Sequence, residues 1–291
     1  MKRGLIVAVL LVAAASSALA TPLIWRPAPT LKPMSFEAYL GTNYMQTART
    51  YDWTAGEWKD LADDKKTTVI KLFPAVLFCP VNNLEVGVLA PVFSKTQGDN
   101  SSFGLTDLWV KARYRVLNSK LIPLQATLSA AAIIPAADQD AKPSLGDKST
   151  DFGLGLILMS KKVANMTFHA RAGYWLNGTY TKTDGEVEST VDVGDMFEWL
   201  LKVVYVFNSR SNVWLTVAGT SQSGTETTVG GETTTGKPTE RLMPWVGAVF
   251  KPIPGVKLAI RPKVGLPLEF GSKGGSLQPW EAGLDFWVDL P

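Results

Sequence analysis

The sequence has very few of the residues that cross-link a chain or bind a metal. It contains one cysteine, Cys79, and one histidine, His169. A single cysteine cannot form an internal disulfide, and one Cys with one His cannot supply the ligands of a usual zinc site. We therefore expect no disulfide, no metal and no other cofactor.

After residue 20 the sequence also lacks an apolar run of about 18 residues, so no membrane-spanning helix is predicted. Residues 1–20 place Lys2 and Arg3 before an apolar run and end in the small-residue sequence Ala18-Leu19-Ala20. This pattern is typical of a secretory signal peptide cleaved after Ala20. The alternative, an uncleaved membrane anchor, would need a longer apolar segment.

The sequence also has no large excess of positive or negative charge. The chain has 29 Lys and Arg against 26 Asp and Glu, and without Lys2 and Arg3 the basic residues number 27. A nearly neutral chain offers no global field for polyanions, so no nucleic-acid partner is predicted.

The sequence is rich in period-2 alternation, over stretches of about 10 to 16 residues separated by polar, Gly-rich or Pro-containing segments. Within one stretch, Val256, Leu258 and Ile260 alternate with Lys257 and Arg261. Twelve strands are predicted, over residues 35–48, 66–80, 84–95, 102–117, 121–135, 150–162, 165–180, 192–207, 212–222, 239–252, 256–270 and 277–290.

The connections between these strands alternate between short and long. Tight turns such as 82–83 and 253–255 alternate with longer polar loops such as 137–149, 181–191 and 223–238. Outer-membrane barrels show this asymmetry, and an even number of strands returns both chain ends to the periplasm.

Strand length favours a membrane barrel over the alternative, a soluble β-sandwich, whose strands are nearer five or six residues. Aromatic residues also gather near strand ends, as in the girdles of such barrels. We predict an all-β, antiparallel, up-and-down transmembrane β-barrel of about twelve strands over residues 34–291. Residues 1–20 are the predicted signal peptide, and the Pro-containing residues 21–33 are predicted to be a short, extended periplasmic leader.

One region resembles a known family. Phe103-Gly104-Leu105-Thr106-Asp107 leads into the basic and aromatic stretch 108–115, and Phe152-Gly153-Leu154-Gly155 opens a later hairpin. These features are similar to outer-membrane proteins named for the meta-cleavage pathway of phenol degradation (MetA-pathway), which are described as transporters. The resemblance implies an outer-membrane barrel and passage of small, often apolar or aromatic molecules, with no shared catalytic motif. The chain ends in Pro291 where such strands commonly end in an aromatic residue that the barrel-assembly machinery reads.

The inward face of the predicted strands carries charges of both signs, and Lys263 is expected to lie near Asp285 across the last hairpin. These side chains either select solutes at a charged constriction or form ion pairs that fill a narrow lumen. The predicted pore-lining residues are Lys71, Asp107, Lys111, Arg113, Arg115, Arg171, Arg261, Lys263 and Asp285.

The leading hypothesis for function is a channel or transporter for small molecules in the bacterial outer membrane. Its expected partners are membrane lipid, a small-molecule solute and the barrel-assembly machinery. A non-conducting structural or surface-binding barrel is the alternative. An enzyme is not predicted, because His169 is expected to share its face with Arg171 and has no serine two residues away on that face.

Overall fold

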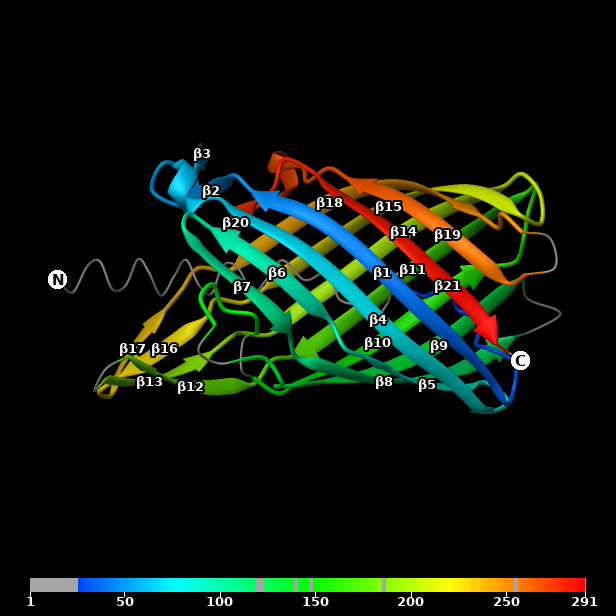
Figure 1. Cartoon of the computed structure of the whole chain (residues 1–291), viewed down its shortest axis with the longest axis horizontal. Coiled ribbons are helices and arrows are strands. Elements are labelled where there is room, and N and C mark those ends of the chain that lie inside the picture. Colours follow the sequence, from blue (N-terminus) through cyan, green and yellow to red (C-terminus); the bar gives the residue numbers. More distant parts are fainter. Residues whose placement is uncertain are drawn as a thin grey trace.

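The structure is a computed structural model that describes residues 26–118, 123–138, 141–146, 149–184, 187–253 and 256–290. The predicted signal peptide and residues 21–25 lie outside the described residues. The main sheet contains 14 strands, and it closes on itself because β1 pairs with β21 on one side and with β4 on the other. Figure 1 shows the tilted strands wrapping into one barrel. The predicted all-β barrel is confirmed.

Twelve strand positions form the ring, because β5 with β6, and β7 with β8, are each one strand with a short interruption. The wall consists of β1 (Ser35–Thr47), β4 (Thr67–Val81), β5 (Leu84–Leu89), β6 (Val92–Gln97), β7 (Asn100–Leu105), β8 (Leu108–Asn118), β9 (Leu124–Ile134), β10 (Asp151–Ser160), β11 (Met166–Leu176), β14 (Met196–Val206), β15 (Ser211–Gln222), β18 (Thr239–Phe250), β19 (Leu258–Gly265) and β21 (Glu281–Leu290).

The two interruptions correct the predicted strands 84–95 and 102–117, which had been expected to be continuous. The first break falls at Ala90-Pro91, where Pro91 has no N–H to donate to a neighbouring strand. The second falls at Thr106-Asp107, and the Thr106 N–H donates to the Pro91 carbonyl at 2.8 Å. The ladder therefore continues past both breaks, with a shift of one residue in the pairing, from Leu89 opposite Trp109 to Val92 opposite Leu105.

Tight turns join the strands at one end of the barrel, and the longer connections leave from the other. In Figure 1 the C-terminus lies at the tight-turn end on the right. Outer-membrane barrels place such turns in the periplasm, so we call this the inner end and the opposite end the outer end.

The outer end carries structure that the sequence pattern did not predict. The predicted loop 181–191, with the adjoining ends of the predicted strands 165–180 and 192–207, forms the hairpin of β12 (Thr179–Asp184) with β13 (Val187–Asp192). The predicted loop 223–238 contains the hairpin of β16 (Glu226–Val229) with β17 (Glu232–Thr235). Pairing of β13 with β16 joins them into a four-stranded sheet that projects beyond the wall (Figure 1).

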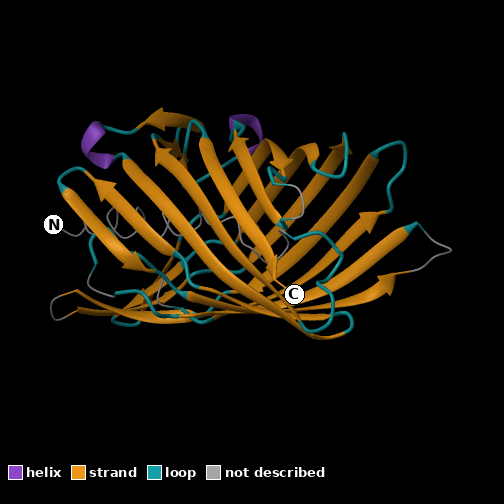
Figure 2. Cartoon of the chain, turned by 45° about the vertical axis from the view of Figure 1, so that its right-hand side comes forward, coloured by secondary structure: helices purple, strands orange, loops and turns teal. Residues whose placement is uncertain are grey.

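A second small sheet also lies at the outer end, where β2 (Arg49–Asp52) pairs with β3 (Glu57–Asp60) and β20 (Ser276–Leu277). Two single 3-10 turns, η2 (Asp63–Lys65) and η3 (Glu269–Gly271), lie near it. They are the helical segments of Figure 2. Among the described residues no helix is long and apolar enough to cross a membrane.

The outer surface of the barrel is apolar between two rows of aromatic side chains, as predicted from the strand ends. Phe36 stacks on Phe78 near the inner end, with ring centroids 4.4 Å apart, and Tyr44 stacks on Trp280 near the outer end, at 5.3 Å. The side chains exposed between these rows are aliphatic, among them Leu40, Val76, Val88, Val110, Leu154, Leu201, Leu215 and Val246. Such a belt suits lipid, with aromatic girdles at its two interfaces.

Candidate functional site in the barrel lumen

The first described residues, 26–33, lie inside the barrel. The Thr127 hydroxyl on β9 donates to the Ala28 carbonyl at 2.5 Å, and the Arg113 guanidinium on β8 donates to the Pro27 carbonyl. Ala28 is fully buried. The described part of the predicted leader is therefore not an extended periplasmic linker, because its backbone carbonyls bond to inward-facing side chains of the wall. We call residues 26–33 the internal segment.

A network of ion pairs fixes the start of this segment. The Arg26 guanidinium pairs with the carboxylate of Glu37 on β1, and its Nε lies 3.4 Å from the carboxylate of Glu85 on β5. Glu85 also accepts from Arg113 at 2.8 Å and from the Leu31 N–H at 3.3 Å. Two arginines are thus matched by two carboxylates, as buried charges require.

The lone cysteine marks the other end of the internal segment. Cys79 is fully buried, and its sulfur lies 3.2 Å from the carbonyl oxygens of Leu31 and Val81, either of which can accept its one proton. The Met34 N–H donates to the Cys79 carbonyl at 2.6 Å. The segment therefore covers Cys79 before the chain enters β1.

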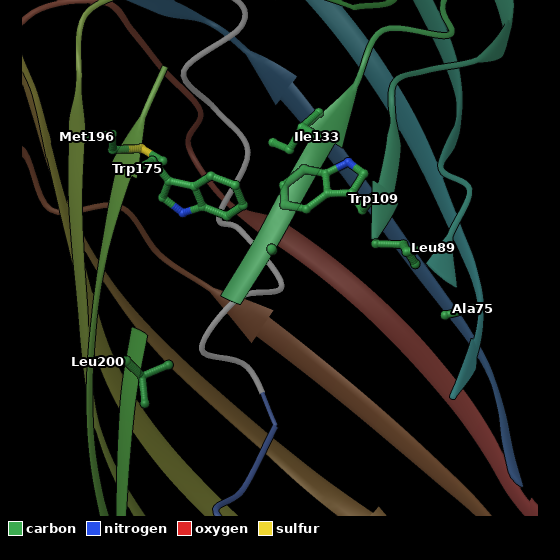
Figure 3. Packing of buried hydrophobic residues seen from close by; sticks show 8 residues of the cluster. Ala75, Leu89, Trp109, Ile133, Trp175, Met196 and Leu200 are labelled. Carbon is green, nitrogen blue, oxygen red and sulfur yellow. The ribbon is translucent and has the colours of Figure 1, made fainter. Parts of the chain in front are cut away.

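The outer half of the lumen contains an apolar cluster. Trp109 and Trp175 lie edge to face with ring centroids 5.5 Å apart, and Figure 3 shows their rings turned toward each other. A Cβ at Gly153 would lie 2.8 Å from the Trp175 ring, so a glycine there lets the ring lie flat on the wall. The buried members of this tryptophan cluster are Ala75, Leu89, Trp109, Ala131, Ile133, Trp175, Met196 and Leu200.

The connection after β9 folds over the outer mouth. Leu145 is buried against Met45 and Phe93, and the Ser102 hydroxyl donates to the Pro143 carbonyl at 2.7 Å. The Lys95 ammonium donates to the Ser144 carbonyl. Residues 141–146 of this connection therefore narrow the outer mouth.

Basic side chains gather in the middle of the lumen, around Asp285 on β21. Asp285 is fully buried and accepts from Arg261 at 2.5 Å and from Lys263 at 3.2 Å. Lys263 thus lies beside Asp285 as predicted, although Arg261 is the residue directly opposite it in the ladder. The Asp285 carboxylate therefore lies between two cations on this wall.

A cavity of about 180 Å³ lies between the internal segment and this wall. Both apolar and charged side chains line it. Its lining residues are Arg26, Pro27, Glu37, Tyr39, Phe73, Ala75, Leu77, Leu89, Lys111, Arg261 and Trp287.

The structure places the nine predicted pore-lining residues in three groups. Lys111 and Arg261 line the cavity, and the partners of the ion pairs described above surround it, namely Arg113, Lys263 and Asp285. The buried residues Lys71 and Arg171 face the lumen elsewhere. Asp107 accepts the Ala136 N–H at 3.2 Å and Arg115 binds Asn83 at 2.6 Å, so both hold nearby backbone or turns. A role of any of the nine in passage stays a prediction.

His169 points inward and is buried, as its register predicts. Its Nδ1 lies 3.1 Å from an Arg171 nitrogen and its Nε2 3.2 Å from the Thr167 hydroxyl. Among the described residues, no serine or carboxylate is hydrogen-bonded to this ring, and no group of three His, Cys, Asp or Glu side chains could hold a metal ion. The ring nitrogens are therefore occupied by an arginine and a threonine.

Sequence reasoning missed Arg26, Glu37 and the aromatic lining residues. Arg26 was assigned to the leader, where no alternation indicates a face. Glu37 gave a usable signal, because the alternation of β1 puts this carboxylate on the inward face, where a buried charge needs a cationic partner.

Solved structures include proteins with a similar fold. A crystal structure of an outer membrane channel from Pseudomonas putida F1 matches with a TM-score of 0.76 and 13% identity, over 90% of this chain and 98% of that chain. A TodX monoaromatic hydrocarbon channel variant matches with a TM-score of 0.48 and 11% identity, over 88% of this chain and 90% of that one. No protein-family model and no curated protein matches the sequence. The first likeness shows that the two proteins share the barrel fold.

Proposed function

We propose that this chain is a channel of the bacterial outer membrane through which small molecules pass. One observation carries the proposal: a cavity with charged and apolar lining lies inside a closed barrel whose outer face is a lipid-compatible belt. A barrel of twelve strand positions is wider than eight-stranded barrels that side chains fill. The shared fold with an outer membrane channel supports the same reading.

The proposal includes the route to the membrane. Residues 1–20 act as a signal peptide removed after Ala20, the barrel inserts with help from the barrel-assembly machinery, and membrane lipid contacts the apolar belt. The likeness to the phenol meta-cleavage family makes an apolar or aromatic solute the finer hypothesis.

The internal segment must move, or leave a path beside it, for a solute to cross. It is held to the described wall by hydrogen bonds and ion pairs, with Glu85 at their centre, and by the burial of Ala28. Such contacts can exchange for water when the segment is displaced, at a cost of a few kcal/mol per buried pair. We therefore treat the internal segment as a movable obstacle in the lumen.

Two measurements test the proposal. Purified protein whose gel mobility depends on heating is placed in planar bilayers for single-channel recording, and in liposomes for swelling with small solutes. Discrete current steps or solute-dependent swelling support a channel. A folded barrel that passes neither ions nor solutes contradicts the proposal.

A second candidate, a surface-binding barrel, is favoured by the four-stranded sheet at the outer end. Removal of the hairpin 226–235 separates the two functions, because this hairpin contributes no residue to the cavity lining. A channel keeps its conductance without the hairpin, whereas Lys263→Ala changes it. The reverse result would favour the surface role.

A further inference from the structure

The cavity has more positive than negative side chains in its lining. Arg26, Lys111 and Arg261 contribute cations, and Glu37 contributes the carboxylate. The cations reach the cavity from the internal segment, from β8 and from β19, so they surround it from three sides.

Two of these cations have carboxylate partners. Arg26 pairs with Glu37 and Glu85, and Arg261 pairs with Asp285. Among the described residues, no carboxylate lies within 4.0 Å of the Lys111 ammonium. A cation inside a barrel without a paired anion is costly, and an anion brought by a solute would offset that cost.

Apart from the Tyr39 hydroxyl, the rest of the lining is apolar. It consists of the Tyr39 ring, Pro27, Phe73, Ala75, Leu77, Leu89 and Trp287. The volume of about 180 Å³ compares with about 150 Å³ for an engineered apolar cavity that holds one benzene molecule. The cavity therefore has room for one ring-sized apolar group beside a charged group.

We propose that this cavity binds a small monocarboxylate whose apolar part is about the size of one aromatic ring. The solute's carboxylate accepts from the Lys111 ammonium, and its ring lies against Phe73 and Leu77. The inference rests on the proposed channel function, because it names the class of solute that the channel accepts.

The test is calorimetric binding to the full-length protein in lipid nanodiscs, with benzoate and benzyl alcohol as probes. The two probes share a ring and differ in charge. We expect benzoate to bind about tenfold or more tightly than benzyl alcohol, the effect of one hydrogen bond to a charged group. In Lys111→Gln this preference should vanish, and in Lys111→Arg, which keeps the charge, it should persist.

Lys202→Gln is the matched control. Lys202 is a second lumen-facing lysine with no carboxylate within 4.0 Å among the described residues, but its Nζ lies 4.0 Å from the Trp214 ring centroid, outside the cavity lining. We expect benzoate affinity within about twofold of wild type in this variant. Equal loss in Lys202→Gln and Lys111→Gln would show a diffuse positive field and overturn the site.

Other outcomes also overturn the inference. Equal affinity for both probes in wild type would make the cavity merely apolar, and displacement of benzoate by chloride at equal concentration would make it a general anion site. These failures differ from failure of the channel. A protein that binds benzoate through Lys111 but passes no solute refutes the channel alone, and one that passes solutes without preferring benzoate refutes this inference alone.

Discussion

The internal segment should leave the wall when Glu85 loses its charge. Glu85 is a buried carboxylate that holds Arg113, Arg26 and the Leu31 N–H together. In Glu85→Gln, Arg113 keeps a charge on a side chain that is 1% exposed. An uncompensated buried charge costs about 3–5 kcal/mol, and water can relieve it once the segment moves away. Docking of the segment should therefore weaken by up to that amount.

The lone cysteine reports this change directly. Cys79 is covered by Leu31 while the segment is docked. If the thiol reacts only from the undocked state, the rate of modification follows the population of that state. A cost of about 3 kcal/mol raises the population of the undocked state about a hundredfold. We therefore expect a water-soluble maleimide to modify Cys79 up to about a hundredfold faster in the folded Glu85→Gln barrel than in the wild type.

Two further variants separate docking from side effects. Arg26→Gln keeps the Glu85 charge near the thiol yet removes two ion pairs of the segment, so modification of Cys79 should again accelerate. Glu269→Gln removes an exposed carboxylate paired with Arg49 and should leave the rate unchanged. A rate within about twofold of wild type in folded Glu85→Gln would refute the reasoning, because docking would then not depend on this carboxylate.

Three other predictions follow from the lumen. Asp285→Asn should lower the free energy of unfolding by about 3–5 kcal/mol, since Arg261 and Lys263 both lose their shared carboxylate. Urea titration measures this change as the loss of the gel band of the unheated, folded barrel. Trp175→Ala should cost about 3–5 kcal/mol and widen the lumen, seen as lower urea resistance with larger current steps; unchanged currents would place the constriction elsewhere. Gly153→Val should push the Trp175 ring off the wall and reduce conductance, and an unaltered current would show that the ring can shift without narrowing the path.

Much of the wall could be predicted from the sequence, because each strand repeats one simple rule. Side chains at every second position face lipid and must be apolar. The sequence of each strand alone therefore shows which residues face lipid, such as Leu40, Val76 and Val110. The same rule put Lys111 and Asp285 inside. Strand interruptions such as Pro91 were harder to predict, since the alternation continues past them.

The internal segment could not be predicted in this way. Its residues have no period, and its partners Glu85, Arg113 and Thr127 lie 54 to 99 positions further along the chain. The sheet at the outer end was missed for a different reason. Its strands, such as Glu226–Val229 and Glu232–Thr235, are mostly exposed, so no apolar face marks them and only the run of β-branched threonines hints at a strand.

The partners of the internal segment bear on the order in which the molecule assembles. The hydrogen bonds and ion pairs described for residues 26–33 join them to β1, β4, β5, β8 and β9, which come from the first half of the chain. Barrel closure instead pairs Phe36 with Leu290, a contact between the two extremes of the sequence. Contacts of short sequence separation form faster than such a closure. The segment can therefore settle on the half-formed wall, and the last strand closes the barrel around a lumen that is already occupied.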